Sequence, residues 1–175
     1  SFVNKFLKCC RKNQPALYLK ELLNHQVERR EGKGNTVFLQ APDVKNGVGG
    51  LRDYQGILWM AKVKFNLENL DGLIHKKYLS EQEANSFEDA YSFLLRVRNE
   101  LHFRSNRPVD TLHLEKQPEI ALGLGYPQED IFRRVEAFMG DYYSKAQTIH
   151  QISGILEERL VHANSGNTSN ILDTQ

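Results

Sequence analysis

The feature that most constrains the fold is a long apolar repeat toward the C-terminal end of the chain. Between residues 132 and 160, apolar or small side chains recur at alternating steps of three and four. The members of this repeat are Phe132, Val135, Met139, Tyr142, Ala146, Ile149, Ser153, Leu156 and Leu160. Such spacing is typical of a helix that buries one face in a coiled-coil-like seam. Phe138, Ile152 and Ile155 widen that face, which predicts packing in a helical bundle rather than in a two-helix zipper.

Residues typical of helix starts divide the rest of the chain into further predicted helices. Pro15 suits the first turn of a helix, and Ser80 followed by Glu83 has the pattern of a capping box. The predicted helices run from Pro15 to about Glu31, from Leu51 to about Asn66, from Ser80 to about Ser105 and around Leu114 to Leu122, with a shorter region from Leu70 to Tyr78. A β-like run covers residues 36–39. Together these patterns predict an all-α fold, a bundle with long antiparallel helices and one glycine-rich loop.

The length of the chain, 175 residues, suits one compact domain. We therefore predict a single helical domain over residues 1–162. From Ala163 onward the chain turns to Asn, Ser, Gly and Thr, so residues 163–175 are predicted to be a flexible polar tail that frays.

The balance of charge argues against two classes of partner. Lys and Arg number 23 and Asp and Glu number 22, which gives a formal net charge of +1. This balance supplies no general electrostatic field that would attract nucleic acid or an anionic membrane. The sequence also contains no run of about 18 apolar residues, which a membrane-spanning helix would require. The start of the chain is too short and too charged for a signal peptide. The adjacent Cys9 and Cys10 are poorly placed for a disulfide, so we expect reduced thiols and a cytoplasmic protein.

A glycine-rich loop between the first two predicted helices is the most distinctive local feature. Gly49 and Gly50 allow the backbone to approach a neighbour closely, and a helix begins directly after them. Amides at a helix start, flanked by the cations Lys45 and Arg52, suit a phosphate. The other interpretation is structural: the glycines permit an awkward entry into the helix, and Asp53 complements its first turn. The pattern is not that of a dinucleotide-binding or P-loop motif.

Arg52 is predicted to be more than a surface arginine. It shares one helix face with Gly56, Trp59 and Val63, at steps of four, three and four. Because the opposite face is also apolar, the helix is predicted to lie between neighbours and Arg52 to be partly buried. A buried guanidinium requires a carboxylate or phosphate partner.

A second cation lies in an apolar stripe of the long central helix. Arg98 follows Leu94 by one turn, and His102 follows Arg98 by another. One interpretation is a partly buried ion pair that holds the bundle together, with Asp53 and Asp110 as the favoured partners. The other is a secondary cationic patch for a nucleotide phosphate.

The sequence offers no catalytic residues and no metal site. Phosphoryl-type nucleotidyl transfer needs closely spaced carboxylates that hold two divalent metals. The only acidic pair separated by one residue is Glu81 and Glu83, and helix capping explains both. The chain alone is therefore predicted to be catalytically inert and to need no cofactor.

Several motifs, in order along the chain, resemble one protein family. They are residues 38–45, Gly49-Gly50-Leu51-Arg52-Asp53, Leu58-Trp59, residues 96–102, the segment from Arg107 to Tyr126, and residues 135–143. The first three resemble the Leu-x-Glu-Pro-Asp-x-Lys, Gly-Gly-Leu-Arg-Asp and Leu-x-Trp stretch of bacterial PII uridylyltransferase/uridylyl-removing enzymes. Residues 96–102 resemble that family's Arg-x-Arg-x-x-Leu-His.

The resemblance implies a helical accessory domain that follows the nucleotidyltransferase domain of such an enzyme. The intact enzyme would use Mg²⁺ and a nucleoside triphosphate, and the chain's partners would be the catalytic domain of the same polypeptide and a PII-like signalling protein under nitrogen control. Lys45, Arg52 and the amides of Gly49 and Gly50 would then complete the triphosphate site. Ala41 stands where the family usually has glutamate before the proline. If that glutamate helps to position substrate or metal, the activity of the intact protein would be altered.

Two alternatives differ from this reading. Glutamine synthetase adenylyltransferases share a looser Gly-Gly-x-Arg-x-x-Glu pattern, so that AMP rather than UMP would be transferred. The chain could instead be a non-enzymatic scaffold whose grooves bind a partner in a signalling protein. An Asp-x-Asp motif after a strand, upstream of this chain, would favour the enzyme.

Overall fold

The computed structural model of the chain describes residues 15–162. Its elements are α2 (Pro15–Glu31), α3 (Leu51–Phe65), α4 (Asp71–His75), α5 (Glu81–Ser105), the 3₁₀ turn η1 (Leu114–Lys116), α6 (Gln117–Gly123) and α7 (Ile131–His162). These bounds match the predicted helices closely. The predicted tail at residues 163–175 and the two cysteines lie outside the described residues.

The β-like run at residues 36–39 does not form a strand, so this prediction is wrong. Val37 is buried and Phe38 is exposed, as in a strand, but no segment among residues 15–162 pairs with this run to form a ladder. The isolated bridge in this region instead joins Asp43 to Thr111. The β-like run is therefore a loop segment that places Val37 in the core and leaves Phe38 exposed.

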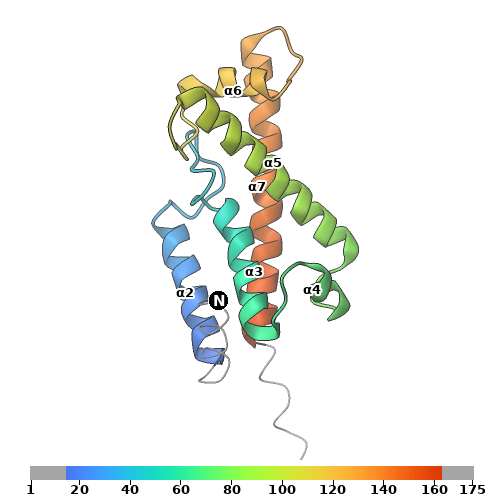
Figure 1. The fold of residues 1–175 in the computed structure, drawn as a ribbon. Coiled ribbons are helices and arrows are strands. Elements are labelled where there is room, and N and C mark those ends of the chain that lie inside the picture. The colour runs from blue at the N-terminus through green and yellow to red at the C-terminus, as the bar shows by residue number, and fades with distance from the viewer. Residues whose placement is uncertain (1–14, 163–175) are drawn as a thin grey trace, which may run out of the picture.

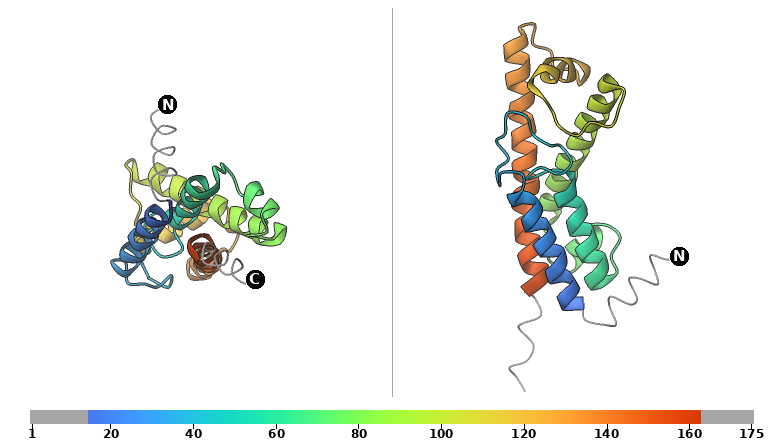
Figure 2. Two further views of the ribbon diagram at one scale, coloured as in Figure 1. Left: turned by 90° about the horizontal axis from the view of Figure 1, so that it is seen from below. Right: turned by 90° about the vertical axis from the view of Figure 1, so that its left-hand side faces the viewer.

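Helix α7 is the spine of the bundle (Figure 1). It packs against α2, α3, α5 and α6, and Figure 2 shows α2 and α3 side by side along one part of its length. Helix α2 runs opposite to both α3 and α7, and α5 crosses α7 in the opposite direction. The predicted all-α bundle with long antiparallel helices is confirmed, although α3 and α7 run in the same direction.

The apolar repeat of α7 supplies the centre of the core. Its buried members are Met139, Tyr142, Ala146, Ile149, Ser153, Leu156 and Leu160, with Phe138 and Ile152 beside them. The prediction is wrong at two places: Phe132 is 84% exposed and Ile155 is 41% exposed. Phe132 is the second residue of α7 (Ile131–His162), and at this helix end no described element covers its side chain.

The start of α5 follows the predicted capping box. The Ser80 hydroxyl accepts a hydrogen bond from the Glu83 amide at 3.2 Å, and the Glu83 carboxylate accepts one from the Ser80 amide at 2.8 Å. The amide and hydroxyl of Ser80 lower the pKa of Glu83 by stabilising its charged form. Asn106, with a φ of 50°, ends the helix in the left-handed conformation.

Candidate functional site

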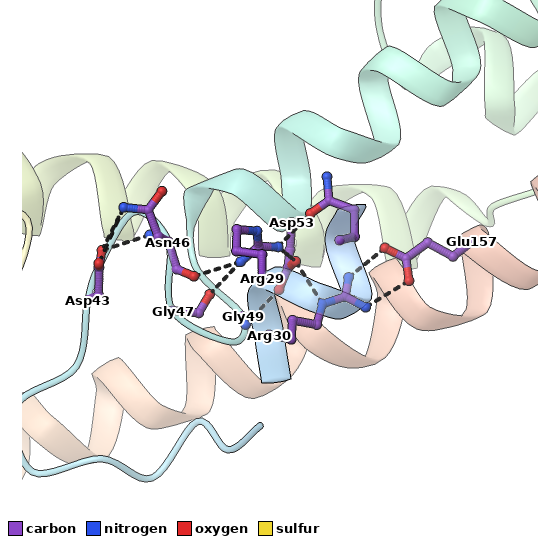
Figure 3. Close-up of polar contacts among 9 residues, drawn as sticks. Arg29, Arg30, Asp43, Asn46, Gly47, Gly49, Asp53 and Glu157 are labelled. Carbon is purple, nitrogen blue, oxygen red and sulfur yellow. Dashed lines mark hydrogen bonds and ion pairs between the residues drawn. The ribbon is translucent and has the colours of Figure 1, made fainter. Parts of the chain in front are cut away.

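The glycine loop is folded by the side chain of Asp43. Its carboxylate accepts a hydrogen bond from the amide of Asn46 at 2.7 Å (Figure 3). It also accepts from the amide of Lys45 at 3.1 Å and from the Lys33 ammonium at 2.9 Å. Burial opposes ionisation of Asp43, but the Asn46 amide and the Lys33 charge outweigh it and lower the pKa of this carboxyl. The first half of the loop is thus a turn organised around one anion.

The two glycines at the end of the loop meet other parts of the same chain. Gly49 has a φ of 68°, and a Cβ there would lie 2.1 Å from the Ala146 carbonyl oxygen on α7. At Gly50 a Cβ would lie 2.9 Å from three carbonyl oxygens of the loop. The close approach predicted from the glycines therefore exists, but it is an approach to α7 and to the loop itself.

The amides at the start of α3 are also engaged within the chain. Gly49 donates to Asp53 Oδ2 at 2.7 Å. The amides of Gly50, Leu51, Arg52 and Asp53 donate to the carbonyls of Gly47, Val44, Lys45 and Gly50, each at 3.0 Å. Both glycines are buried. The expectation of free amides at this helix start is therefore wrong, and the structural interpretation of the glycines explains them.

Asp53 is the centre of a buried ion network that the sequence did not suggest. Its carboxylate, fully buried in the first turn of α3, accepts hydrogen bonds from Arg29 and, at 2.9 Å, from Arg30 Nε (Figure 3). Arg30 in turn pairs with Glu157 of α7 through two hydrogen bonds, one of 2.9 Å. Burial opposes the charge of Arg30, but Glu157 and Asp53 outweigh it and raise the pKa of the guanidinium. The network ties α2, α3 and α7 together.

Arg29 extends this network to the loop. Besides Asp53, its guanidinium donates to the carbonyls of Asn46 at 2.7 Å and Gly47 at 3.3 Å. The loop is thus held from α2 by Arg29 and from α3 by Asp53. Both contacts are polar and largely buried, so they fix the position of the loop relative to the helices.

Arg52 lies outside the network. Its side chain is exposed rather than partly buried, and it makes no hydrogen bond or ion pair with any residue between 15 and 162. The reason is that its neighbour Asp53 points to the interior, where the arginines of α2 and the Gly49 amide occupy both of its oxygens. Arg52 therefore keeps a surface charge that no described residue compensates.

A groove of about 440 Å³ opens between α2 and α3 beside Arg52. It is lined by Leu22, His25, Gln26, Arg29, Asn46, Arg52, Gln55, Gly56 and Trp59. The groove exists because Gly56 has no side chain: a Cβ there would lie 2.3 Å from the Gln26 amide nitrogen. Trp59, 46% exposed, forms one wall. We call this surface the α2–α3 groove.

The second predicted cluster surrounds Asp110. Arg98 donates to its carboxylate at 2.6 Å, His102 Nε2 lies 3.2 Å from the same oxygen, and the Lys45 ammonium lies 3.8 Å away. Burial opposes ionisation of Asp110, but the hydrogen bonds of Arg98 and His102 and the charges of Arg98 and Lys45 lower its pKa. The predicted pairing of a partly buried Arg98 with a carboxylate is confirmed, with Asp110 and not Asp53 as the partner.

The predicted phosphate-facing residues therefore separate into different surroundings. Gly49 and Gly50 belong to the interior, Lys45 to the Asp110 cluster and Arg52 to the α2–α3 groove. Within residues 15–162, no three His, Cys, Asp or Glu side chains are grouped as metal ligands. In the same range, no helix combines the length and the apolar character that a bilayer crossing requires.

The described residues thus form a helical module in which Arg29 and Asp53 fix the glycine loop and Arg52 is exposed at the surface. The model of the family described as GlnD PII-uridylyltransferase matches residues 18–157. The chain belongs to this family.

Curated relatives agree with the match. The chain is 38% identical over 133 residues to a bifunctional uridylyltransferase/uridylyl-removing enzyme of Pseudomonas aeruginosa, covering 75% of this chain and 15% of the relative. It is 32% identical over 158 residues to the enzyme of the same name from Phenylobacterium zucineum, covering 90% and 17%. The chain thus spans about a sixth of the length of these relatives. No solved structure matches it significantly.

Proposed function

We propose that this chain is the helical domain of a uridylyltransferase-type enzyme, where it packs against a nucleotidyltransferase domain of the same polypeptide and helps to shape the nucleotide site. The observation that carries the proposal is the exposed guanidinium of Arg52 at the start of α3, which pairs with no residue in the described range 15–162. A cation of this kind is available to a phosphate of a nucleotide held by a neighbouring domain. The locked loop supports the proposal because it presents Arg52 from a fixed backbone.

Lys45 is the second proposed phosphate contact. The Arg52 amide donates to the Lys45 carbonyl at 3.0 Å, so the two backbones are joined. The Lys45 side chain lies 3.8 Å from Asp110, in a cluster where one carboxylate faces Lys45, Arg98 and His102. One carboxylate does not balance the two positive charges of Lys45 and Arg98. Lys45 and Arg52 would therefore contact the nucleotide at different points.

The chemistry of the intact enzyme would require groups from outside the described residues. Mg²⁺ bound by carboxylates of the catalytic domain would neutralise the phosphates during transfer of UMP. The names of the relatives favour uridylyl transfer over adenylyl transfer, and the family description favours a PII protein as the substrate. Such a reaction would take place in the cytoplasm.

The full-length enzyme with Arg52→Ala tests the proposal. We expect the dissociation constant of UTP to rise about ten- to a hundredfold, the loss of one charge-assisted hydrogen bond, while the melting temperature stays unchanged. Arg133→Ala is the matched control, because Arg133 is also exposed and forms no side-chain hydrogen bond with a described residue. Unchanged UTP affinity in Arg52→Ala, or a lowered melting temperature, would assign Arg52 to another role.

A further inference from the structure

The α2–α3 groove combines three chemical features that the ion network does not use. Trp59 offers an exposed aromatic face, Arg52 and His25 offer polar groups with no hydrogen-bond or ion-pair partner among residues 15–162, and the lining contains no carboxylate. In a chain with a net charge of +1, a groove without an acidic side chain is locally cationic. An exposed tryptophan beside cations is typical of a surface that binds a planar ring and an anion.

Each remaining polar side chain of the groove has at least one partner within the chain. Arg29 donates to Asp53, Gln26, Asn46 and Gly47, and Gln55 donates to Tyr91 at 3.3 Å. Asp53 is fully buried and forms ion pairs with Arg29 and Arg30, so its carboxylate is not exposed to a ligand in the groove. What the groove presents to a ligand is therefore the charge of Arg52, the imidazole of His25 and the ring of Trp59.

The spacing of these groups suggests the size of the ligand. Arg52 and Trp59 lie seven residues apart on the same face of α3, which corresponds to about 10 Å along the helix axis. A ring that stacks on Trp59 would need a linker with more than one phosphate to reach Arg52. The volume of about 440 Å³ falls in the range of small-molecule sites.

We infer that the α2–α3 groove is a binding site for a nucleoside di- or triphosphate, with the base against Trp59 and the terminal phosphate at Arg52. This inference rests on the proposed function through Arg52, and it adds Trp59 and His25 as binding residues. It also adds that the helical chain binds the nucleotide by itself, without another domain.

The chain supplies its own reporter for this site, because Trp59 is its one tryptophan. Titration of the 175-residue chain with UTP in the absence of divalent metal should quench Trp59 fluorescence in a saturable manner. UMP should bind more weakly than UTP, because its single phosphate does not reach Arg52. Uridine should not bind, and tripolyphosphate should displace UTP without the same quenching.

Two variants separate the groove from general attraction to a cationic protein. Arg52→Gln should weaken UTP binding about tenfold or more, whereas Arg133→Gln, an exposed arginine on α7, should leave it unchanged. Circular dichroism should show the same helix content in both variants. The inference would be overturned if both variants weakened UTP binding equally, or if UTP caused no saturable quenching. It would also be overturned if UMP or tripolyphosphate bound as tightly as UTP.

The failure of this inference is distinguishable from the failure of the proposed function. If the isolated chain binds UTP but the Arg52→Ala full-length enzyme has unchanged UTP affinity, the groove is a nucleotide site separate from transfer. If the isolated chain does not bind UTP but the full-length variant loses affinity, the inference is wrong and the proposed function stands.

Discussion

At the scale of single residues, Asp53 explains why the Gly-Gly-Leu-Arg-Asp segment has its spacing. The Gly49 amide donates to the Asp53 carboxylate four residues later, and the same carboxylate receives Arg29 and Arg30. A buried carboxylate is costly unless it is paired and hydrogen-bonded, and here both oxygens are used. One side chain therefore closes the loop and orients the neighbouring Arg52 outward.

Replacing Asp53 with Asn should strongly destabilise the bundle. The change removes one anion from a network of two arginines and two carboxylates, which leaves an uncompensated buried cation. We expect a loss of about 3–5 kcal/mol in the free energy of unfolding, measured by urea denaturation. Asp89→Asn is the control, since Asp89 is exposed on α5 and has no hydrogen bond or ion pair within residues 15–162. Equal stability of the two variants would contradict a structural role for the network.

The partners of Asp53 could not be predicted from the sequence. For Arg98, the sequence reduced the candidate partners to two carboxylates, Asp53 and Asp110. Arg98 lies in an apolar stripe, where a carboxylate partner is a physical requirement, and Asp110 is only 12 residues away. Arg29 and Arg30 stand in the last turn of α2, where the helix dipole gives basic residues a local explanation. Glu157 is 127 residues from Arg30, and no local pattern signals a contact over that distance.

At the scale of elements, the period of α7 predicted which face is buried but not how far along the helix burial extends. Met139 is 7% exposed, whereas Phe132, in the same stripe, is 84% exposed. A helix continues for as long as its own backbone permits, but its stripe is buried only where other elements cover it. The extent of cover depends on α2, α3, α5 and α6, which the sequence of α7 does not contain.

This difference gives a matched pair of variants in one helix. Met139→Asp places a charge in the buried seam and should lower the free energy of unfolding by about 3 kcal/mol or more. Phe132→Asp introduces the same side chain at an exposed position and should change it by no more than about 0.5 kcal/mol. Thermal or urea denaturation of both variants measures the difference. A large loss in Phe132→Asp would show that its exposed face is covered in solution.

At the scale of the whole molecule, the near-zero net charge conceals an uneven distribution. The interior holds a balanced network of Arg29, Arg30, Asp53 and Glu157. The described residues that line the adjoining α2–α3 groove include Arg29 and Arg52 but no carboxylate. The sequence predicted that Arg52, Gly56 and Trp59 share a face of α3, and the groove contains all three. It did not predict that α2 faces them across an open groove, because helix pairing depends on the packing of the whole bundle.

Nucleotide binding and catalysis are expected to be separable in this chain. Nucleotidyl transfer needs carboxylates that hold divalent metals. Of the buried carboxylates in the described residues, Asp53 and Glu157 are neutralised by arginines and Asp43 is paired with Lys33. We therefore expect the 175-residue chain to bind UTP in the groove but to transfer no labelled UMP to a PII protein in the presence of Mg²⁺. The full-length enzyme, assayed in parallel, is the positive control. Metal-dependent labelling by the chain itself, abolished by EDTA and retained after further purification, would show that these 175 residues contain a catalytic centre.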